Sequence, residues 1–318
     1  MSSDSARVLP FIIHPSAGTD ALQQLREGAE LNQDRLARHG ALLFRGFAID
    51  SGQAFEQFAR TLTGDLYGDY GDLPKEAAGQ DIYESTPYPA TEMILFHNES
   101  SHMTSWPTRQ LFYCAVPARR GGATPIVDCR RMLDRLAPEV VDAFERKGLR
   151  YVRVFNEGLD VPWQEFFRTS DRGEVEAKCG AMGIQAIWLA DGTLRTEALC
   201  PAVLSHPVTG ERVFFNQVQL HHPATLNREV REDLVSIFGA ERLPRNVTYG
   251  DGSPIGDDVI ADVGQAYEHC AVRFSWQAGD VVLLDNMLVA HARDPFEGPR
   301  KIMVAMGRMM QRSTVWRN

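Results

Sequence analysis

The sequence lacks the signatures of several large protein classes. Its five cysteines are widely spaced and include no C-x-x-C pair, which argues against a disulfide framework and against a structural zinc site. No stretch approaches the roughly 20 apolar residues that span a bilayer, and no basic region precedes the short apolar run near the N-terminus. We therefore expect a soluble, cytoplasmic protein with reduced thiols, no secretory signal and no membrane partner.

Basic residues are in deficit. Lysine and arginine number 33 against 42 aspartates and glutamates, so the formal net charge is -9 and the isoelectric point is near 5.5. This balance argues against broad binding to nucleic acid and leaves small molecules or other proteins as the expected partners. A hydrophobic content of 44% can supply a sizeable core, which excludes a disordered or fibrous chain.

No repeat, low-complexity tract or linker divides the chain, so we expect one domain over residues 1–318. Apolar periodicity and turn residues predict helices over residues 19–39, 52–62, 129–136 and 138–148. Short β-rich runs predict strands over residues 41–47, 110–114, 124–127, 203–204, 212–215, 272–274, 280–284 and 302–306. Many short strands with added helices predict a mainly β fold, either a β-sandwich or a jelly-roll barrel. The irregular stretch 67–90 is long for a connection and is a candidate active-site lid.

An imidazole and a carboxylate stand two residues apart at His97 and Glu99. In a strand or extended loop, side chains at i and i+2 point the same way, so this pair could hold one metal ion. His291, which follows the apolar run 281–284, is an attractive third ligand if a barrel joins early and late strands. Two histidines and one carboxylate on one face of an octahedron leave three open positions, as in non-haem Fe(II) oxygenases. Such a triplet is also common by chance, and other histidines are equally available: His102, His206, His221 and His222.

An arginine nine residues after His291 strengthens the metal-site interpretation. The Arg300 guanidinium is a rigid fork of donors that matches a carboxylate, so it could anchor the far end of a dicarboxylate cosubstrate. Thr124 could add a hydroxyl to the same carboxylate. Adjacent strand residues face opposite ways, so only one of Arg300 and Lys301 can face the pocket. We choose Arg300 because a bidentate contact suits guanidinium better than ammonium.

Together these motifs resemble the taurine dioxygenase superfamily of Fe(II)/2-oxoglutarate-dependent oxygenases, over nearly the whole chain. The likeness rests on His97-Asn98-Glu99, Arg120-Gly121-Gly122-Ala123-Thr124, Asp285-Asn286, His291, Arg293 and Arg300. The segment 40–47 resembles the strand that follows the first helix in these enzymes. The segment 214–222 is similar to the branch that includes the syringomycin-pathway hydroxylases. Glutamate in place of the commoner aspartate is shared with clavaminate-synthase-like and asparagine-hydroxylating members.

The resemblance implies a double-stranded β-helix (jelly-roll) core with added helices. It implies that His97, Glu99 and His291 bind iron, and that Thr124 and Arg300 bind the distal carboxylate of 2-oxoglutarate. Fe(II), 2-oxoglutarate and dioxygen would be the cofactor and cosubstrates, with succinate as a product. Related halogenases replace the carboxylate ligand by a small residue, so the retained glutamate favours hydroxylation over halogenation.

For the substrate, the resemblance implies β-hydroxylation of an amino acid, free or tethered to a peptidyl carrier protein, in antibiotic or other specialised metabolite biosynthesis. An oxygenase of another small carboxylate or sulfonate is the alternative. Two other classes compete: a non-redox, cupin-like metal-binding protein, and a zinc hydrolase with two histidines and a glutamate. Four arginines could pair with a substrate carboxylate, although we expect a solvated surface position for any one of them: Arg119, Arg120, Arg153 and Arg293. The oligomeric state stays open.

Overall fold

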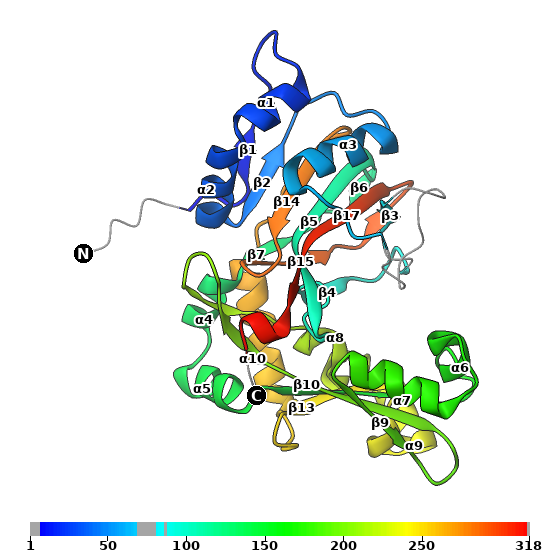
Figure 1. The fold of residues 1–318 in the computed structure, drawn as a ribbon. Helices are drawn as coiled ribbons and strands as arrows, with labels where there is room; N and C mark the ends of the chain where they lie inside the picture. The colour runs from blue at the N-terminus through cyan, green and yellow to red at the C-terminus, as the bar shows by residue number, and fades with distance from the viewer. Residues whose placement is uncertain (1–6, 69–80, 86–87, 317–318) are drawn as a thin grey trace.

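A large sheet and a small sheet form the centre of the molecule (Figure 1). The computed structural model describes residues 7–68, 81–85 and 88–316. Most of the lid predicted over residues 67–90 therefore lies outside the described residues. The strands of the large sheet follow the order β1 (Phe11–Ile13), β2 (Ala41–Phe44), β14 (Val281–Asp285), β5 (Ser105–Val116), β17 (Lys301–Gln311) and β3 (Tyr83–Glu84).

The small sheet joins segments from distant parts of the sequence. Its strands follow the order β4 (Ile94–His97), β15 (Val289–Arg293) and β7 (Ile126–Asp128), and all neighbours are antiparallel. Its residues share one apolar core cluster with the inner face of the large sheet. Two facing sheets around one core are the jelly-roll arrangement that the sequence predicts.

Side chains along β5 alternate between the two faces of the large sheet. Phe112 and Cys114 point into the core between the sheets, whereas Leu111 and Tyr113 belong to a second cluster outside it. That outer cluster is covered by three N-terminal helices, which Figure 1 places against the large sheet: α1 (Ala21–Glu27), α2 (Ala29–His39) and α3 (Gly52–Thr63). The helices leave the inner face of the large sheet uncovered, and side chains on that face line a pocket.

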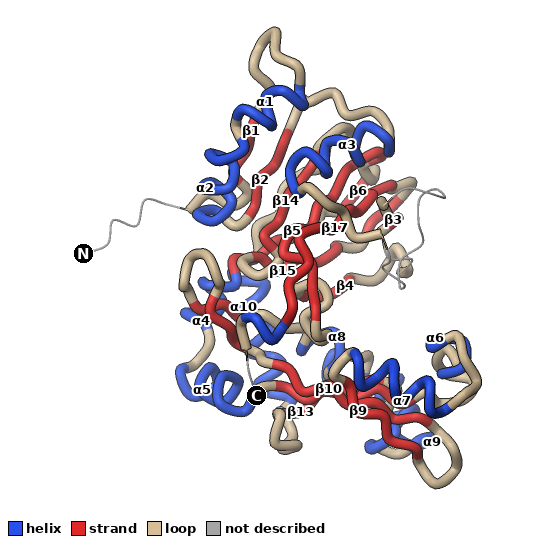
Figure 2. Tube along the Cα trace, viewed as in Figure 1, coloured by secondary structure: helices blue, strands red, loops and turns tan. Residues whose placement is uncertain are grey.

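The chain between β7 and β14 forms a second, mixed region, seen in the lower half of Figure 2. Its strands are β8 (Leu149–Val154), β9 (Ile184–Trp188), β10 (Leu194–Cys200) and β13 (Arg245–Tyr249) in one sheet, and β11 (Val203–Ser205) with β12 (Arg212–Phe214) in a hairpin. Its helices are α4 (Cys129–Arg135), α5 (Pro138–Lys147), α6 (Trp163–Phe167), α7 (Arg172–Ala181), α8 (Val218–His221), α9 (Arg228–Phe238) and α10 (Asp257–Cys270). A further short pair joins β6 (Arg120–Gly121) to β16 (Phe296–Glu297).

Local capping signals place several helix ends where the sequence predicts them. The Asp128 side chain accepts from Arg130 N at the start of α4, and Pro138 occupies the first turn of α5. Gly40 ends α2 in the left-handed conformation at φ 80°, where a Cβ would also lie 2.6 Å from Val289 Cγ2. Only glycine fits this junction between the helix and the sheet.

Two predictions of secondary structure are wrong. The single helix predicted over residues 19–39 is two helices, because Gly28 sits between α1 and α2 at φ -90° and ψ 10°, outside helical geometry. The strand predicted over residues 272–274 is one isolated bridge between Val272 and Ile126. Its apolar side chains pack elsewhere: Phe274 meets Trp276 edge-on at 4.9 Å between ring centroids. Helices α6, α7, α8, α9 and α10 were not predicted from the sequence.

All five cysteines are buried and unpaired, as expected. Within residues 7–68, 81–85 and 88–316, no helix combines the length and apolar character that crossing a membrane requires.

Candidate metal centre and cosubstrate pocket

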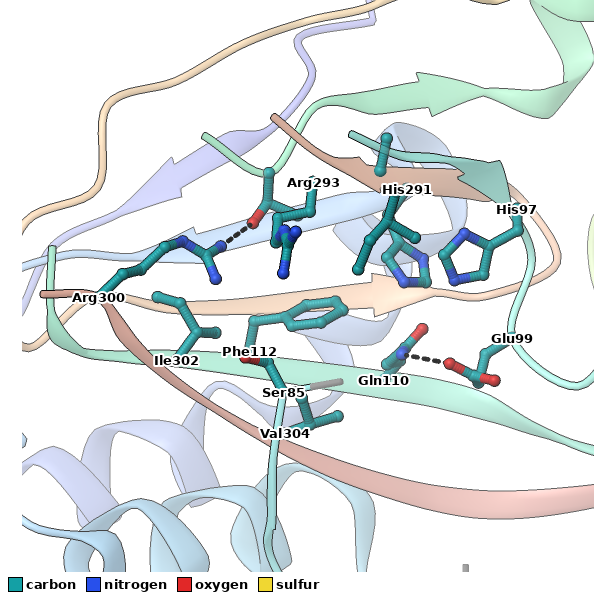
Figure 3. A pocket seen from close by; sticks show the side chains of 13 residues that line it. Ser85, His97, Glu99, Gln110, Phe112, His291, Arg293, Arg300, Ile302 and Val304 are labelled. Atoms are coloured by element: carbon teal, nitrogen blue, oxygen red, sulfur yellow. Dashed lines mark hydrogen bonds between the residues drawn. The ribbon is translucent and has the colours of Figure 1, made fainter. Parts of the chain in front are cut away.

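His97 and His291 lie directly opposite each other in the small sheet. They are register partners of β4 and β15, and their ring centroids are 4.3 Å apart. Both side chains are buried. Figure 3 shows the two imidazoles side by side at one end of a pocket between the sheets. Pairing of an early strand with a late one thus brings together two residues far apart in the sequence.

Glu99 completes the cluster two residues beyond His97. One ligand atom from each of His97, Glu99 and His291 lies within 4.8 Å of the others. The Glu99 carboxylate accepts hydrogen bonds from Ser100 N at 3.1 Å and from Gln110 Nε2 at 3.3 Å. The intervening Asn98 is fully buried and bonds Asn286 O and Cys129 Sγ, and Glu99 lies in the turn that follows β4.

The imidazoles are prepared to bind a divalent metal. His97 Nδ1 lies 2.8 Å from the Leu95 carbonyl oxygen, an acceptor, so Nε2 is the ring nitrogen left to face a ligand. Burial, and then the neighbouring His97, lowers the pKa of His291 well below its ordinary value. Neutral imidazole is the form that binds metals. Two histidines and a carboxylate match the donor set of non-haem Fe(II) sites.

Asn286 holds the backbone of Glu99 through both ends of its amide. Its Oδ1 accepts from Glu99 N at 2.8 Å, and its Nδ2 donates to Glu99 O at 2.9 Å and to Pro107 O at 2.8 Å. Asn286 is fully buried. Asn98 Nδ2 donates in turn to Asn286 O at 2.7 Å. The carboxylate of the metal cluster is therefore positioned from the turn that follows β14.

Asn286→Ala should weaken divalent metal binding by about 10–100-fold, as loss of residues that support a metal ligand commonly does. The Glu99 backbone would lose two hydrogen bonds and leave buried polar groups unpaired. Asn286→Asp is a matched variant, because it can still accept from Glu99 N but cannot donate to Glu99 O. Calorimetric titration with Mn(II) should place it between alanine and the parent protein. Equal metal affinity in all three proteins would show that Asn286 does not position Glu99.

A buried ionic cluster supports the same turn. Asp285 Oδ2 accepts from Arg109 Nη1 at 2.6 Å and lies 3.3 Å from His206 Nε2. Burial alone would raise the pKa of Asp285, but the hydrogen bond from His206 and the charge of Arg109 outweigh it, so the pKa lies below its ordinary value. His206, one of the alternative metal ligands considered from the sequence, therefore pairs with a carboxylate.

The lowered pKa of Asp285 has a consequence for acid stability. The ionised Asp285 carboxylate adds to the free energy of unfolding above its unfolded-state pKa of about 3.9. This addition is lost as the pH falls through the lower pKa of the folded state. Denaturant unfolding across this range should show a free energy of unfolding that falls with acidification, with a shallower slope in Asp285→Asn. Asp262→Asn, on the exposed side of α10, controls for loss of one negative charge. Equal slopes in Asp285→Asn and the parent protein would contradict this account.

Arg300 lies at the end of the pocket opposite the histidines (Figure 3), and Thr124 lines the same pocket. Arg300 Nη2 lies 3.4 Å from Thr124 Oγ1, and Arg300 Nε donates to Gly122 O at 3.0 Å. Burial, with a smaller effect of Arg293, lowers the pKa of Arg300 to about 10, so its side chain stays charged near neutral pH. Arg300 lines this pocket, and Lys301 is not among the lining residues.

Arg293 is buried, which contradicts the surface position expected for it. Its Nη atoms donate to three backbone carbonyls: Tyr88 O at 3.1 Å, Pro89 O at 2.6 Å and Glu92 O at 2.9 Å. Figure 3 places its side chain between Arg300 and His291. The pocket therefore contains two guanidinium groups beside one carboxylate, Glu99, and favours an anionic occupant.

The other histidines stand outside the metal cluster. His222 is buried and its ring bonds Ile255 and Ala224, so the sequence pair His221-His222 is no exposed turn. The ring centroids of His102 and His221 lie 5.3 Å apart, with the ring planes tilted by 47°. Sequence reasoning gave no role to Gln110, which contacts Glu99 from the inner face of β5. The sequence does carry one signal for Gln110: it is a polar residue two positions before Phe112, on the same otherwise apolar face of the strand.

The chain is similar to known proteins over most of its length. The family described as Taurine catabolism dioxygenase TauD, TfdA family matches residues 14–306. Dapdiamide synthesis protein DdaC of Enterobacter agglomerans is 40% identical over 273 residues, which are 85% of this chain and 83% of that protein. A clavaminate synthase-like protein of Arabidopsis thaliana is 30% identical over 283 residues, 85% of this chain and 82% of that protein.

The fold has solved counterparts. PvcB of Pseudomonas aeruginosa superimposes with a TM-score of 0.57 at 14% identity, over 96% of this chain and 90% of that chain. A second PvcB structure is described as an Fe, alpha-ketoglutarate dependent oxygenase from an isonitrile synthetic pathway. These likenesses confirm the jelly-roll fold, and the family match is incompatible with the zinc-hydrolase and non-redox alternatives. The chain belongs to the TauD/TfdA family and is an Fe(II)/2-oxoglutarate-dependent dioxygenase.

Proposed function

We propose that this dioxygenase hydroxylates the β-carbon of an amino acid, either free or tethered to a peptidyl carrier protein, in the biosynthesis of a specialised metabolite. The observation that carries the proposal is its 40% identity to a protein named for dapdiamide synthesis, over 85% of the chain.

In this proposal His97, Glu99 and His291 hold Fe(II), and Thr124 and Arg300 hold the distal carboxylate of 2-oxoglutarate. The iron, when bound, supplies dioxygen activation, which couples decarboxylation of 2-oxoglutarate to succinate with oxidation of a substrate carbon. The chain itself orients the two reactants and limits water around them. Phe112, Ile302 and Val304 supply apolar walls between the two polar ends of the pocket.

Mass spectrometry of products tests the substrate. Each proteinogenic amino acid would be supplied free and as a carrier-protein thioester, with Fe(II), 2-oxoglutarate and oxygen, and searched for a gain of one oxygen atom. Substrate deuterated at the β-carbon should lose one deuterium for each oxygen gained. The His291→Ala variant is the enzyme control.

Two results would contradict the proposal. Oxygen gained without loss of β-deuterium would place the reaction at another carbon. Turnover confined to a sulfonate or to a carboxylate without an amino group would favour the alternative small-molecule oxygenase.

A further inference from the structure

Trp276 contacts Thr124, a residue that lines the cosubstrate end of the pocket, from outside the pocket. It lies in the loop between α10 and β14, where its ring is 9% exposed and packs edge-on against Phe274. Its indole Nε1 donates to Thr124 Oγ1 at 3.1 Å. Trp276 is absent from the pocket lining, so it acts on an occupant only through Thr124.

This bond fixes what the Thr124 hydroxyl can do. A hydroxyl oxygen has two lone pairs and one proton. The indole of Trp276 occupies one lone pair, and Arg300 Nη2, at 3.4 Å, approaches the other. Thr124 is 3% exposed and lines the pocket. Its remaining hydrogen-bonding capacity is therefore donation of the hydroxyl proton.

Arg300 presents only donors to the same place. One of them, Nε, is used by Gly122 O at 3.0 Å, which orients the guanidinium along the pocket. Gly122 permits this approach, because a Cβ there would lie 3.1 Å from Arg300 Cδ. The polar contacts of the Arg300 guanidinium are with the Gly122 carbonyl and the Thr124 hydroxyl. Among the described residues, Arg300 and Thr124 therefore offer an occupant at this end N–H and O–H donors.

We propose that Trp276 is a specificity-determining positioning residue, which keeps the Thr124 hydroxyl a donor and so makes this end of the pocket select a carboxylate over a neutral carboxamide. The inference rests on the proposed role of Thr124 and Arg300 in holding the distal carboxylate of 2-oxoglutarate. A carboxylate oxygen accepts from both groups, whereas the NH2 of a carboxamide would face a donor. Without the indole N–H, the hydroxyl gains a free lone pair and can rotate to accept from that NH2.

Two inert probes measure this selection directly. N-oxalylglycine mimics 2-oxoglutarate, and N-oxalylglycinamide replaces its distal carboxylate by a carboxamide. Both would be titrated calorimetrically into Mn(II)-loaded protein, so that affinity is read without turnover. Trp276→Phe should reduce the preference for the carboxylate probe by about tenfold, the size of one charge-assisted hydrogen bond. Most of the change should be weaker binding of N-oxalylglycine.

Two controls separate this role from general destabilisation. Trp188→Phe removes an indole that donates to Glu176 on the protein surface at 2.7 Å, and should leave the preference unchanged. Thr124→Val removes the hydroxyl, and in that background Trp276→Phe should have no further effect on the preference. Trp276→Leu serves as a second variant if phenylalanine disturbs folding.

The outcomes are distinct. An unchanged preference in a folded Trp276 variant, or an equal loss in the Thr124→Val background, overturns the role of Trp276 and leaves the proposed function intact. Unchanged N-oxalylglycine affinity in Thr124→Val and in Arg300→Met overturns the assigned cosubstrate site, and the inference with it. A lower preference that requires the Thr124 hydroxyl supports both.

Discussion

Replacing His291 by alanine should abolish product formation and weaken divalent metal binding by more than about 100-fold, beyond the loss typical for residues that only support a ligand. The imidazole is one of three side chains whose ligand atoms lie within 4.8 Å of one another. Without His291, only His97 and Glu99 remain to bind the metal, and two ligands cannot reproduce the three-ligand geometry. His97→Ala should therefore show the same defect.

Metal affinity and turnover check this prediction separately. Calorimetric titration with Mn(II) reports the metal site, and succinate release reports the reaction. His269→Ala, on an exposed position of α10, should match the parent protein in both measurements. Thermal unfolding of the metal-free proteins shows whether the core survives the substitution. Undiminished product formation by His291→Ala or His97→Ala would refute the assignment of the metal ligands.

The metal cluster could be predicted because its residues stand in short, recognisable segments of the sequence. The i, i+2 spacing of His97 and Glu99 needs only an extended backbone, and a β-rich run leads directly into His291. The one long-range assumption, that an early strand pairs with a late one, is what a barrel topology requires. The register of β4 and β15 bears it out.

The supporting contacts could not be predicted in the same way. Asn286 bonds Glu99 across 187 positions, and Trp276 bonds Thr124 across 152. No periodicity or motif spacing relates such pairs, because their approach depends on how loops leave the ends of strands. Arg293 shows the converse error: an arginine is usually solvated, but here three backbone carbonyls replace the water around it. The fold and the candidate ligand cluster can be predicted from sequence patterns, whereas the contacts that position the cluster depend on tertiary packing.

Arg300→Met should raise the KM for 2-oxoglutarate by about 100-fold or more, since each hydrogen bond to a charged group contributes about 1.5–3 kcal/mol. The guanidinium is buried at the pocket end and is braced by Gly122 O. The turnover number at saturation should change far less, because the distal carboxylate is remote from the reacting atoms. Arg300→Lys keeps the charge but loses the planar fork, so its KM should fall between those of methionine and arginine.

The identity of the cosubstrate anchor is decided by two comparisons. Lys301→Met removes the neighbouring positive charge at the start of β17, and it should leave the KM for 2-oxoglutarate unchanged if Arg300 is the anchor. With 2-oxobutanoate, which lacks the distal carboxylate, the parent protein and Arg300→Met should be equally poor. A defect in Lys301→Met with a normal Arg300→Met would move the anchor to the lysine. Because adjacent residues of a strand face opposite sides, both variants showing the full defect would instead indicate a disturbed β17.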